Sequence, residues 1–520
     1  MKTALRLAPN ENRCMKKTSA NPIRPALAAL ALCSALCGCL PGPKYQKPSA
    51  PAATAPAYKE SPANFKDAEG WKVAQPQEGM LRGKWWEIFN DPELNALEEQ
   101  LDINNQNIKV NFENYMAARA VIREDRAQLW PTVTTGPSWN RARSSSNLTN
   151  SSTANVGHES TEWTLPLDVS WSPDFFGKIR SQIREAQYGA QVSAADLEVE
   201  RLLEEATLAE TYFEIRGQDE LQRVLNDTVE ADKKALELTQ NQYETGIGSY
   251  ISVVEARATL KQVESQALNV GVARAQYEHA IATLLGQPAT GFSIPVKPLL
   301  ISPPPVPIGV PSQLLERRPD VAATERTLAE ANATIGIGYG AFFPTVTLSA
   351  AGGFEASQFT KWFDWPSRFW SIGPQLSQTL FNGGLYRAAL QQYTAQYNAN
   401  VATYRQTVLT AFQQVEDYLA ATRILSQQIL KQKEAVDSSK EELDLEMFRY
   451  QSGIDPYLSV TVAQTTLLSN QQSLTTLSVQ QTVAAVELIQ ALGGGWDVSQ
   501  LPTTAQVSEK PNKADYTRQK

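Results

Sequence analysis

The feature that most constrains this chain is an internal repeat. Short segments recur in the same order in its two halves, and the two later pairs of segments are both separated by 207 positions. The matched pairs are residues 130–134 (WPTVT) with 343–347 (FPTVT), 243–250 (YETGIGSY) with 450–457 (YQSGIDPY), and 284–286 (LLG) with 491–493 (ALG). A chain of 520 residues that repeats over such a distance is expected to contain two copies of one structural plan.

Each half contains a long stretch that favours helix. Residues 176–243 contain no proline, and residues 249–285 form a second, returning stretch. In the returning stretch a seam of residues recurs at alternating steps of three and four, with one polar interruption at Arg274. The seam comprises Leu260, Val263, Ala267, Val270, Arg274, Tyr277, Ile281 and Leu284, and its counterpart comprises Leu467, Asn470, Leu474, Leu477, Gln481, Ala484, Leu488 and Ala491. The outgoing helices would be about 100 Å long, so we expect such thin hairpins to be stabilised by assembly.

Each half also contains segments in which apolar and polar residues alternate. The clearest are residues 163–171 in the first half and residues 346–354 and 370–376 in the second. Alternation over about ten residues predicts strands with one apolar face, and aromatic residues near the strand ends are typical of an outer-membrane barrel. A soluble sheet with one buried face has the same pattern and is the alternative. Pro166 and Pro374 lie within these segments and argue against a regular ladder.

Composition excludes several classes of function. The net charge is −8 and the chain has no long basic run, so it lacks the electrostatic footprint of a nucleic-acid-binding protein. Its four cysteines are Cys14, Cys33, Cys37 and Cys39, and it has two histidines. The body of the protein therefore has no residues for a disulfide framework or a thiolate metal site. We expect no enzyme activity, no catalytic residues, no metal site and no cofactor beyond a covalent lipid.

The N-terminal residues resemble an export signal. Lys16, Lys17 and Arg24 precede an apolar stretch, residues 26–36 (ALAALALCSAL), which has the length of a signal-peptide core and is too short to span a bilayer. The stretch runs into a sequence similar to the bacterial lipobox, in which Cys39 would carry a diacylglycerol and an N-linked acyl chain such as palmitate. Ordinary cleavage after small residues is the alternative.

These features predict six segments. The connector between the halves is rich in proline, with 8 prolines between residues 288 and 311, and is expected to be extended. The predicted segments are a signal peptide (1–38), a lipidated extended segment (39–84), a first repeat (85–286), the connector (287–313), a second repeat (314–494) and a polar tail (495–520). Each repeat should contribute helices and two strands.

Several motifs resemble those of TolC-like outer-membrane factors, specifically the efflux lipoproteins of the NodT-type branch. The motifs are residues 42–45 (GPKY), 85–97 (WWEIFNDPELNAL), 314–321 (LLERRPDV), 342–344 (FFP) and 381–384 (FNGG). The resemblance covers nearly all of residues 39–496. Arg317, Arg318 and Asp320 within the third motif are interpreted as ion pairs at a helix start, and Trp85 and Trp86 as packing residues.

The resemblance implies an α+β membrane protein and a location in the outer membrane of a Gram-negative bacterium. Three identical chains, each giving four strands, would form a twelve-stranded barrel continuous with a long periplasmic helical barrel. The implied partners are outer-membrane lipid, a periplasmic adaptor (membrane fusion) protein and an inner-membrane RND-type transporter. The implied function is a passive exit duct for drugs or other small molecules. The duct of a type I protein secretion system and a non-conducting coiled-coil scaffold are the alternatives.

The resemblance also assigns site residues to the hairpin tips. The adaptor-docking turns would be Thr245, Gly246, Ile247 and Gly248 in the first half and Ser452, Gly453 and Ile454 in the second. Family members often carry an aspartate nine residues after the glycine of the second-repeat turn, here Gly453. This chain has Val462 at that position, and the matching first-half residue is Glu255. Leu458 matches a constriction position, which implies an apolar gate. Asp455 could instead supply a shallower acidic ring, although turn chemistry explains it equally well.

Overall fold

The structure is a computed structural model that describes residues 42–49, 58–60, 83–145, 159–298, 303–306 and 314–510. Cys39, the signal segment and the end of the polar tail lie outside these residues. The described residues fall into two compact units. Leu129–Ser181 and Tyr339–Phe381 belong to a sheet unit, and Pro43–Gln128, Gln182–Gly338 and Asn382–Lys520 belong to a helical unit.

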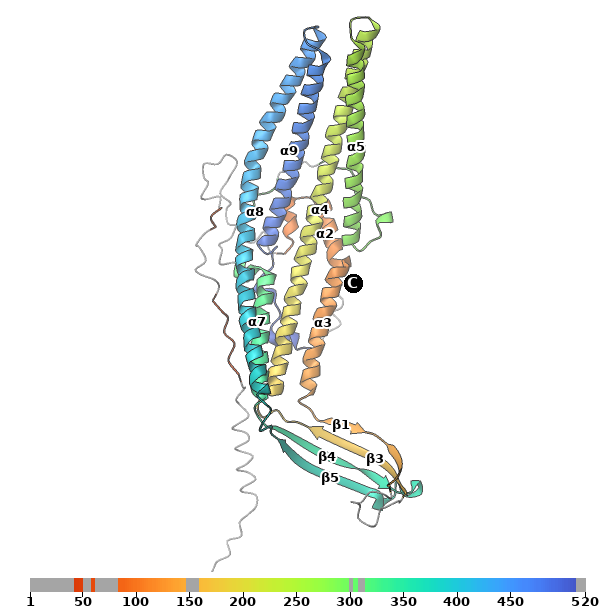
Figure 1. Ribbon diagram of the computed structural model, residues 1–520, viewed down its shortest axis with the longest axis vertical. Helices are drawn as coiled ribbons and strands as arrows, with labels where there is room; N and C mark the ends of the chain where they lie inside the picture. The colour runs from red at the N-terminus through yellow and green to blue at the C-terminus, as the bar shows by residue number, and fades with distance from the viewer. Residues whose placement is uncertain are drawn as a thin grey trace, which may run out of the picture. The chain divides into compact units, whose positions relative to one another are not determined.

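Two long hairpins dominate the helical unit (Figure 1). The first consists of α4 (Lys178–Glu244) and α5 (Tyr250–Leu284), and the second of α8 (Leu385–Gln451) and α9 (Tyr457–Ala491). Helices α4 and α8 both have 67 residues, and α5 and α9 both have 35. The predicted stretches 176–243 and 249–285 agree with α4 and α5 to within two residues at each end. No helix of the described residues is long and apolar enough to cross a membrane.

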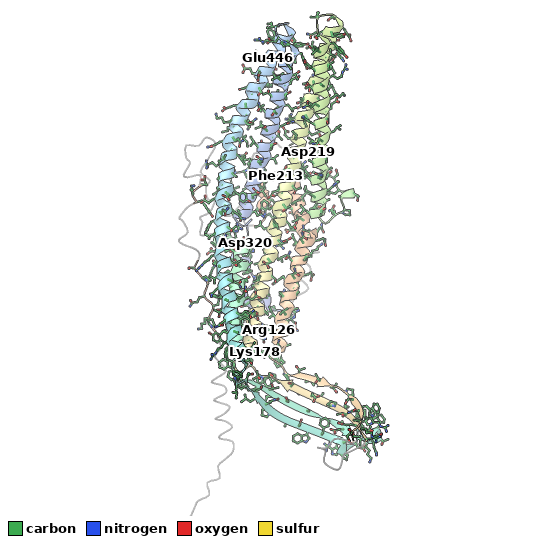
Figure 2. The ribbon with its side chains drawn as sticks, in the orientation of Figure 1. Arg126, Lys178, Phe213, Asp219, Asp320 and Glu446 are labelled. Carbon is green, nitrogen blue, oxygen red and sulfur yellow. The ribbon has the colours of Figure 1, made fainter. Side chains whose placement is uncertain are left out.

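Shorter elements complete the helical unit. They are η2 (Trp85–Phe89), α2 (Pro92–Asn104), α3 (Gln106–Ala127), η3 (Ala289–Gly291), α6 (Leu314–Arg317), α7 (Pro319–Gly340), η7 (Val498–Gln500) and α10 (Thr504–Val507). The largest apolar cluster joins η2 and α2 to α4, α5, α8 and α9, with Phe213 of α4 fully buried in it (Figure 2). Trp85 and Trp86 are buried in the same cluster, so they are packing residues as predicted.

Both hairpins close against the helical unit in the same way. Gly286 and Gly493 follow α5 and α9 with positive φ angles of 65° and 98°. A Cβ atom at Gly286 would lie 2.6 Å from the Asn104 carbonyl oxygen, and one at Gly493 would lie 2.1 Å from the Arg317 carbonyl oxygen. Both positions therefore require glycine for its backbone conformation and for its lack of a side chain.

Two different side chains cap the matched helix ends. Asn105 Nδ2 donates to the Leu284 carbonyl oxygen at 3.0 Å, and Arg318 Nη1 donates to the Ala491 carbonyl oxygen at 3.0 Å. Arg318 also forms an ion pair with Asp320 in the first turn of α7, 2.6 Å apart. The motif at residues 314–321 is thus a helix-end connection, in agreement with the expected ion pair at a helix start.

The sheet unit is one antiparallel sheet. Its strands are β1 (Thr132–Thr135), β2 (Ser138–Arg143), β3 (Glu159–Trp171), β4 (Thr345–Ala356) and β5 (Arg368–Ser377), in the order β1-β3-β4-β5, with β2 also paired to β3. Two short turns, η5 (Phe359–Lys361) and η6 (Trp365–Ser367), join β4 to β5. Because β1 pairs with residues 167–170 of β3 and β2 with residues 159–164, the two short strands act as one interrupted neighbour of β3.

Apolar residues align across all these strands. One row runs through Val133, Val169, Ala350 and Ile372, and neighbouring rows contain Leu165 with Phe354, and Leu167 with Gly352 and Trp370. Trp370, Ile372 and Leu376 of β5 are largely exposed to solvent in the single chain. The sheet therefore presents a continuous, uncovered apolar face.

The ladder continues through both prolines, which corrects the expectation that they argue against it. Pro166 pairs with Gly353 of β4, and on its other side it faces the break between β1 and β2, where no strand needs its missing N–H group. Pro374 lies in β5 at the edge of the described sheet. Proline is tolerated at such positions because no ladder hydrogen bond is lost.

Candidate functional site

The tips of the two hairpins have the same backbone geometry. Gly246 and Gly453 follow α4 and α8 with φ angles of 76° and 72°. The N–H groups of Gly246 and Ile247 donate to the carbonyl oxygens of Tyr243 and Gln242, and the matching pair in the second tip makes the same two bonds. This pattern is the usual closure of a helix by a left-handed glycine. The predicted docking residues Thr245–Gly248 and Ser452–Ile454 therefore form the two turns.

The two turns enter their returning helices differently. In the first tip the Ser249 hydroxyl accepts from the Ile251 N–H group, which caps α5. In the second tip Pro456 replaces this serine, and Asp455 forms an ion pair with Arg449 of α8. The hydrogen bond from Arg449 lowers the pKa of Asp455. The Asp455 charge is thus compensated within its own turn, which favours the turn interpretation over an acidic ring.

The predicted gate residues Leu458 and Val462 lie one turn apart on α9 and are each 55% exposed. Their neighbours Tyr457, Val460 and Ala463 are buried against the rest of the helical unit. Leu458 and Val462 therefore lie on the unpacked face of α9. Exposed apolar side chains at a tip are typical of a surface that meets another protein chain.

Glu255, the other predicted gate residue, lies on α5 in the first hairpin and is half-buried. Burial raises the pKa of Tyr457 on α9, and the charges of Asp232 and Glu255 raise it further. Glu255 of the first hairpin therefore lies near Tyr457 of the second. Its sequence counterpart Val462 is instead exposed.

A hydrogen bond links the two tips directly. The Tyr450 hydroxyl of α8 donates to Gln242 Oε1 of α4 at 2.5 Å. Below it, Ala235 of α4, Ala256 of α5 and Val460 of α9 pack in one small apolar cluster. Movement of one tip away from the other must break this bond and open this cluster.

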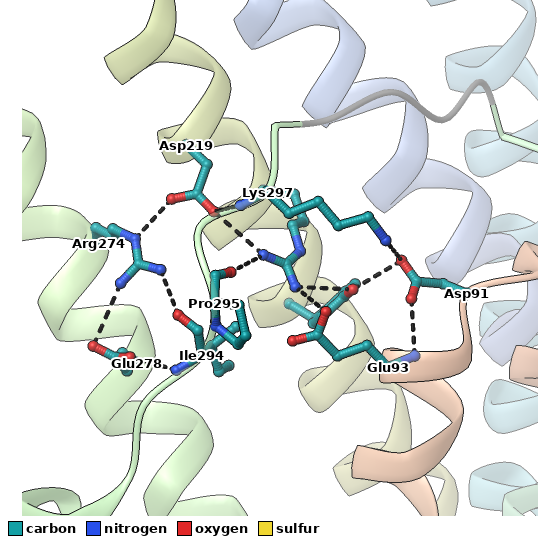
Figure 3. A network of polar contacts seen from close by, with 10 residues as sticks. Asp91, Glu93, Asp219, Arg274, Glu278, Ile294, Pro295 and Lys297 are labelled. Atoms are coloured by element: carbon teal, nitrogen blue, oxygen red, sulfur yellow. Dashed lines mark hydrogen bonds and ion pairs between the residues drawn. The ribbon is translucent and has the colours of Figure 1, made fainter.

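A buried polar network lies midway along the first hairpin (Figure 3). Asp219 of α4 accepts from Arg274 Nε at 2.7 Å, from Arg216 Nη1 at 3.3 Å and from the Lys297 N–H group at 2.9 Å. The side chains of Arg216 and Asp219 are only 3% and 1% exposed. Arg274 is the polar interruption of the predicted heptad seam, and its ion pair with Asp219 explains that interruption.

The same network fixes the start of the proline-rich connector. Arg216 donates to the Pro295 carbonyl oxygen at 2.7 Å, and Arg274 donates to that of Ile294 at 2.8 Å. Arg216 also donates to Glu93 Oε2 at 2.6 Å, and Lys297 Nζ lies 3.3 Å from Asp91 Oδ2. Sequence reasoning missed this arrangement, although the polar break at Arg274 was its signal.

The helical unit also contains buried carboxyl groups that the sequence did not identify. Trp85 Nε1 donates to Glu205 Oε2 at 2.9 Å, and burial raises the pKa of Glu205 to about 8. Nearby, burial raises the pKa of Glu98 well above its usual value. Within the described parts of the chain, no group of three or more His, Cys, Asp or Glu residues is placed to hold a metal ion.

Comparisons with known proteins agree with this geometry. The family described as outer membrane efflux protein matches residues 97–287 and 310–494. The solvent efflux pump outer membrane protein SrpC of Pseudomonas putida is 33% identical over 467 residues, which cover 89% of this chain and 97% of SrpC. The outer membrane protein OprJ of Pseudomonas aeruginosa is 31% identical over 480 residues, which cover 91% of this chain and 96% of OprJ.

Solved structures give the same fold. The outer-membrane channel OprN superposes with a TM-score of 0.78 at 27% identity, over 88% of this chain and 100% of OprN. The CmeC outer membrane channel of Campylobacter jejuni, at 22% identity, shares the fold with a TM-score of 0.79 over 90% of this chain and 97% of CmeC. By its family match, its relatives and its fold, the chain belongs to the outer membrane efflux protein family, a family of TolC-like channels in the outer membrane of Gram-negative bacteria.

Proposed function

We propose that this protein is the passive exit duct of a tripartite efflux system, through which drugs or other small molecules leave the cell. The observation that carries the proposal is the continuous, exposed apolar face of the sheet unit. An uncovered face of this kind is suited to lipid contact when strands close into a barrel. The names of the relatives, which include a solvent efflux pump component, support efflux as the process.

The duct is a homotrimer. Each chain is built from two tandem repeats, 85–286 and 314–494, joined by the connector 287–313, and the matched lengths of α4 with α8 and of α5 with α9 support this division. With β1 and β2 counted as one interrupted strand, each chain gives four strands to a twelve-stranded barrel. Hairpins from three chains then surround a periplasmic tunnel. The trimer also covers apolar side chains that a single chain leaves exposed.

The partners are a periplasmic adaptor and an inner-membrane RND-type transporter. The adaptor docks on the tips formed by Thr245–Gly248 and Ser452–Ile454, where Ile247 and Ile454 are exposed. Leu458 and Val462 from three chains close the tunnel by apolar contact. The transporter supplies the energy, and the duct itself is passive.

The test of this function uses the purified full-length protein in detergent and in planar bilayers. Light scattering should give the mass of a trimer, and the trimer should form a conducting channel in a bilayer. A stable, folded monomer would contradict the twelve-stranded assembly. Loss of the protein should sensitise cells to small toxic compounds, and loss of a secreted protein with unchanged drug sensitivity would contradict the efflux role.

Lipidation of Cys39, with a diacylglycerol and an N-linked acyl chain, is a separate part of the proposal. Cys39→Ser should abolish incorporation of radiolabelled lipid and weaken membrane retention, while the trimer remains because the barrel also inserts. Cys37→Ser is the matched control, because it removes a neighbouring cysteine and should leave labelling unchanged. Undiminished labelling of the Cys39→Ser protein would remove Cys39 as the lipidation site.

A further inference from the structure

A buried carboxyl group without a hydrogen-bond partner lies on α4, a few turns before the tip of the first hairpin. Asp232 of α4 is 2% exposed, and neither of its carboxylate oxygens has a hydrogen-bond partner. On α9, the side chain of Gln464 is also buried, at 8% exposure, and its Oε1 atom receives no hydrogen bond. Burying either group unpaired is costly, and an ionised carboxylate is the more costly of the two.

The register of α4 and α9 places these two residues at the same level. The two helices run in opposite directions, and Ala235 of α4 packs in one cluster with Val460 of α9. One turn from this contact, away from the tips, are Asp232 and Gln464. A second contact gives the same register, because a Cβ atom at Gly217 would lie 2.3 Å from Val479 Cγ2. Fifteen residues from that contact toward the tips are again Asp232 and Gln464.

Among the described residues, no cation contributes to the pKa of Asp232, which is shifted by burial alone. Burial raises the pKa of Tyr457 on α9, and Asp232, Tyr450 of α8 and Glu255 of α5 raise it further, so these groups lie in the same region. On α4 itself, Lys233 is exposed and forms an ion pair with Glu230. Burial raises the pKa of Asp232 from 3.8 to about 6. The packing of α4 against α9 in this structure therefore disfavours the ionised form of Asp232.

We propose that Asp232 and Gln464 form a proton-controlled contact, which stabilises the closed packing of the two hairpins when Asp232 is protonated and weakens it when Asp232 is ionised. The proposal rests on the proposed function, because it assumes a duct with closed and open states. A protonated Asp232 carries the O–H donor that Gln464 Oε1 lacks. When the proton is released to solvent, a carboxylate faces a carbonyl oxygen, and separation of α4 from α9 is needed to hydrate it.

The sign and size of the effect follow from proton linkage. The carboxyl group binds its proton more tightly in the closed state than when it is hydrated, so low pH favours closure and rising pH favours opening. With a pKa of about 6 when closed and 3.8 when hydrated, the open-to-closed ratio should rise about tenfold between about pH 5 and pH 7.5 for each chain of the trimer that opens. Glu205, with a pKa of about 8, titrates close to this pH range and could add its own pH dependence. The test therefore compares variants at each pH.

The experiment measures open probability of the trimer in planar bilayers for the wild type, Asp232→Asn and the control Asp227→Asn. Asp227 lies on the same helix, but its side chain is 69% exposed and pairs with Arg223. The wild type and Asp227→Asn should both show a rise of at least about tenfold. Asp232→Asn should show little pH dependence and remain closed near pH 7.5, because an amide cannot ionise and still offers an N–H donor. A wild-type pH profile in Asp232→Asn would overturn the proposal.

Two further measurements separate this inference from the proposed function and from Gln464's role. Infrared difference spectra of the wild-type trimer should show a carboxylic acid band that is lost as pH rises and is missing in Asp232→Asn, whether or not the protein conducts. A titrating band without any conductance would contradict the duct, and no such band would contradict the contact. Gln464→Leu should shift the opening midpoint to lower pH, since protonated Asp232 loses its acceptor. A shift to higher pH would mean that the amide nitrogen faces the carboxylate and would overturn the contact.

Discussion

The two hairpins share their lengths and their turns but differ in burial and charge. Helix α9 has 15 buried residues among its 35 and carries one charged side chain, Glu487. Helix α5 has the same length, 7 buried residues and six charged side chains. One backbone plan therefore serves two environments: α9 has about twice as many buried residues as α5, whereas α5 exposes a polar surface. The turn glycines are retained in both, because the backbone and not the surroundings requires them.

The arginines at matched positions show the same divergence. Arg216 of α4 holds the connector through Asp219, Glu93 and the Pro295 carbonyl oxygen, and its side chain is almost fully buried. Its counterpart, Arg423 of α8, forms an ion pair with Glu60 of the N-terminal segment at 2.6 Å. Both arginines fasten a segment from outside the hairpins to a long helix. They differ in how deeply the ion pair is buried, and that difference sets the expected cost of removing each one.

The largest expected effect comes from Arg216→Ala. It leaves Asp219 buried with one fewer partner and the Pro295 carbonyl oxygen without its donor, which should lower the free energy of unfolding by about 3–5 kcal/mol. Arg423→Ala is the matched variant and should cost about 1–3 kcal/mol, since its ion pair is nearer the surface. Denaturant unfolding of the detergent-solubilised protein measures both. Equal losses in the free energy of unfolding would mean that the deeper burial of the Arg216 ion pair does not make it more important for stability.

The fold could be predicted further than the site. Helices α4 and α5 were predictable to within two residues because proline is absent and the apolar seam is regular, and β3 to β5 because one face alternates. The ladder through Pro166 was not predictable, since it depends on the break between β1 and β2 on the neighbouring strand. The network around Asp219 was missed because its partners lie far apart in sequence, and the tip hydrogen bond from Tyr450 to Gln242 was missed for the same reason.

Close packing of α9 against α4 gives the next test. Val479 Cγ2 would lie 2.3 Å from a Cβ atom at Gly217, and valine in a helix cannot easily change rotamer. Gly217→Val should therefore destabilise the protein by about 1–3 kcal/mol through overpacking. Gly271→Val on α5, where no atom lies within 4 Å of the added Cβ, should change stability by less than about 0.5 kcal/mol. Thermal unfolding midpoints of the two variants measure the difference. A larger loss of stability for Gly271→Val would contradict the closer packing at Gly217.

The exposed tip residues test whether the gate belongs to the second hairpin. Leu458→Ser should weaken the closed state by about 1–3 kcal/mol, since an apolar contact around the pore is lost. Single-channel conductance should rise, and cells should become sensitive to large antibiotics such as vancomycin. Ile251→Ser, at the matching position of α5, should leave conductance unchanged.

The alternative to an apolar gate is an acidic one, and two more variants distinguish them. Val462→Asp should increase cation selectivity and block by multivalent cations, because it adds a carboxylate to each of three chains at the constriction. If Leu458→Ser conducts like the wild type while Glu255→Gln or Asp455→Asn opens the channel, the constriction is acidic and the apolar gate is wrong.

The smallest expected effect concerns the hydrogen bond between the tips. Tyr450→Phe removes the hydroxyl that donates to Gln242 Oε1 and keeps the ring, which packs at 5.2 Å from the ring of Tyr457. Losing one partly buried hydrogen bond should weaken the closed state by about 0.5–1.5 kcal/mol, or about twofold to tenfold in the open-to-closed ratio. Tyr243→Phe is the matched control. The ring of Tyr243 likewise packs at 5.3 Å from that of Tyr250, and its side chain is more exposed. A rise in open probability for Tyr450→Phe alone would show that the hydrogen bond between the hairpins helps to hold the duct closed. An equal rise for both variants would show instead that the two tips contribute alike to closure, through ring packing within each tip.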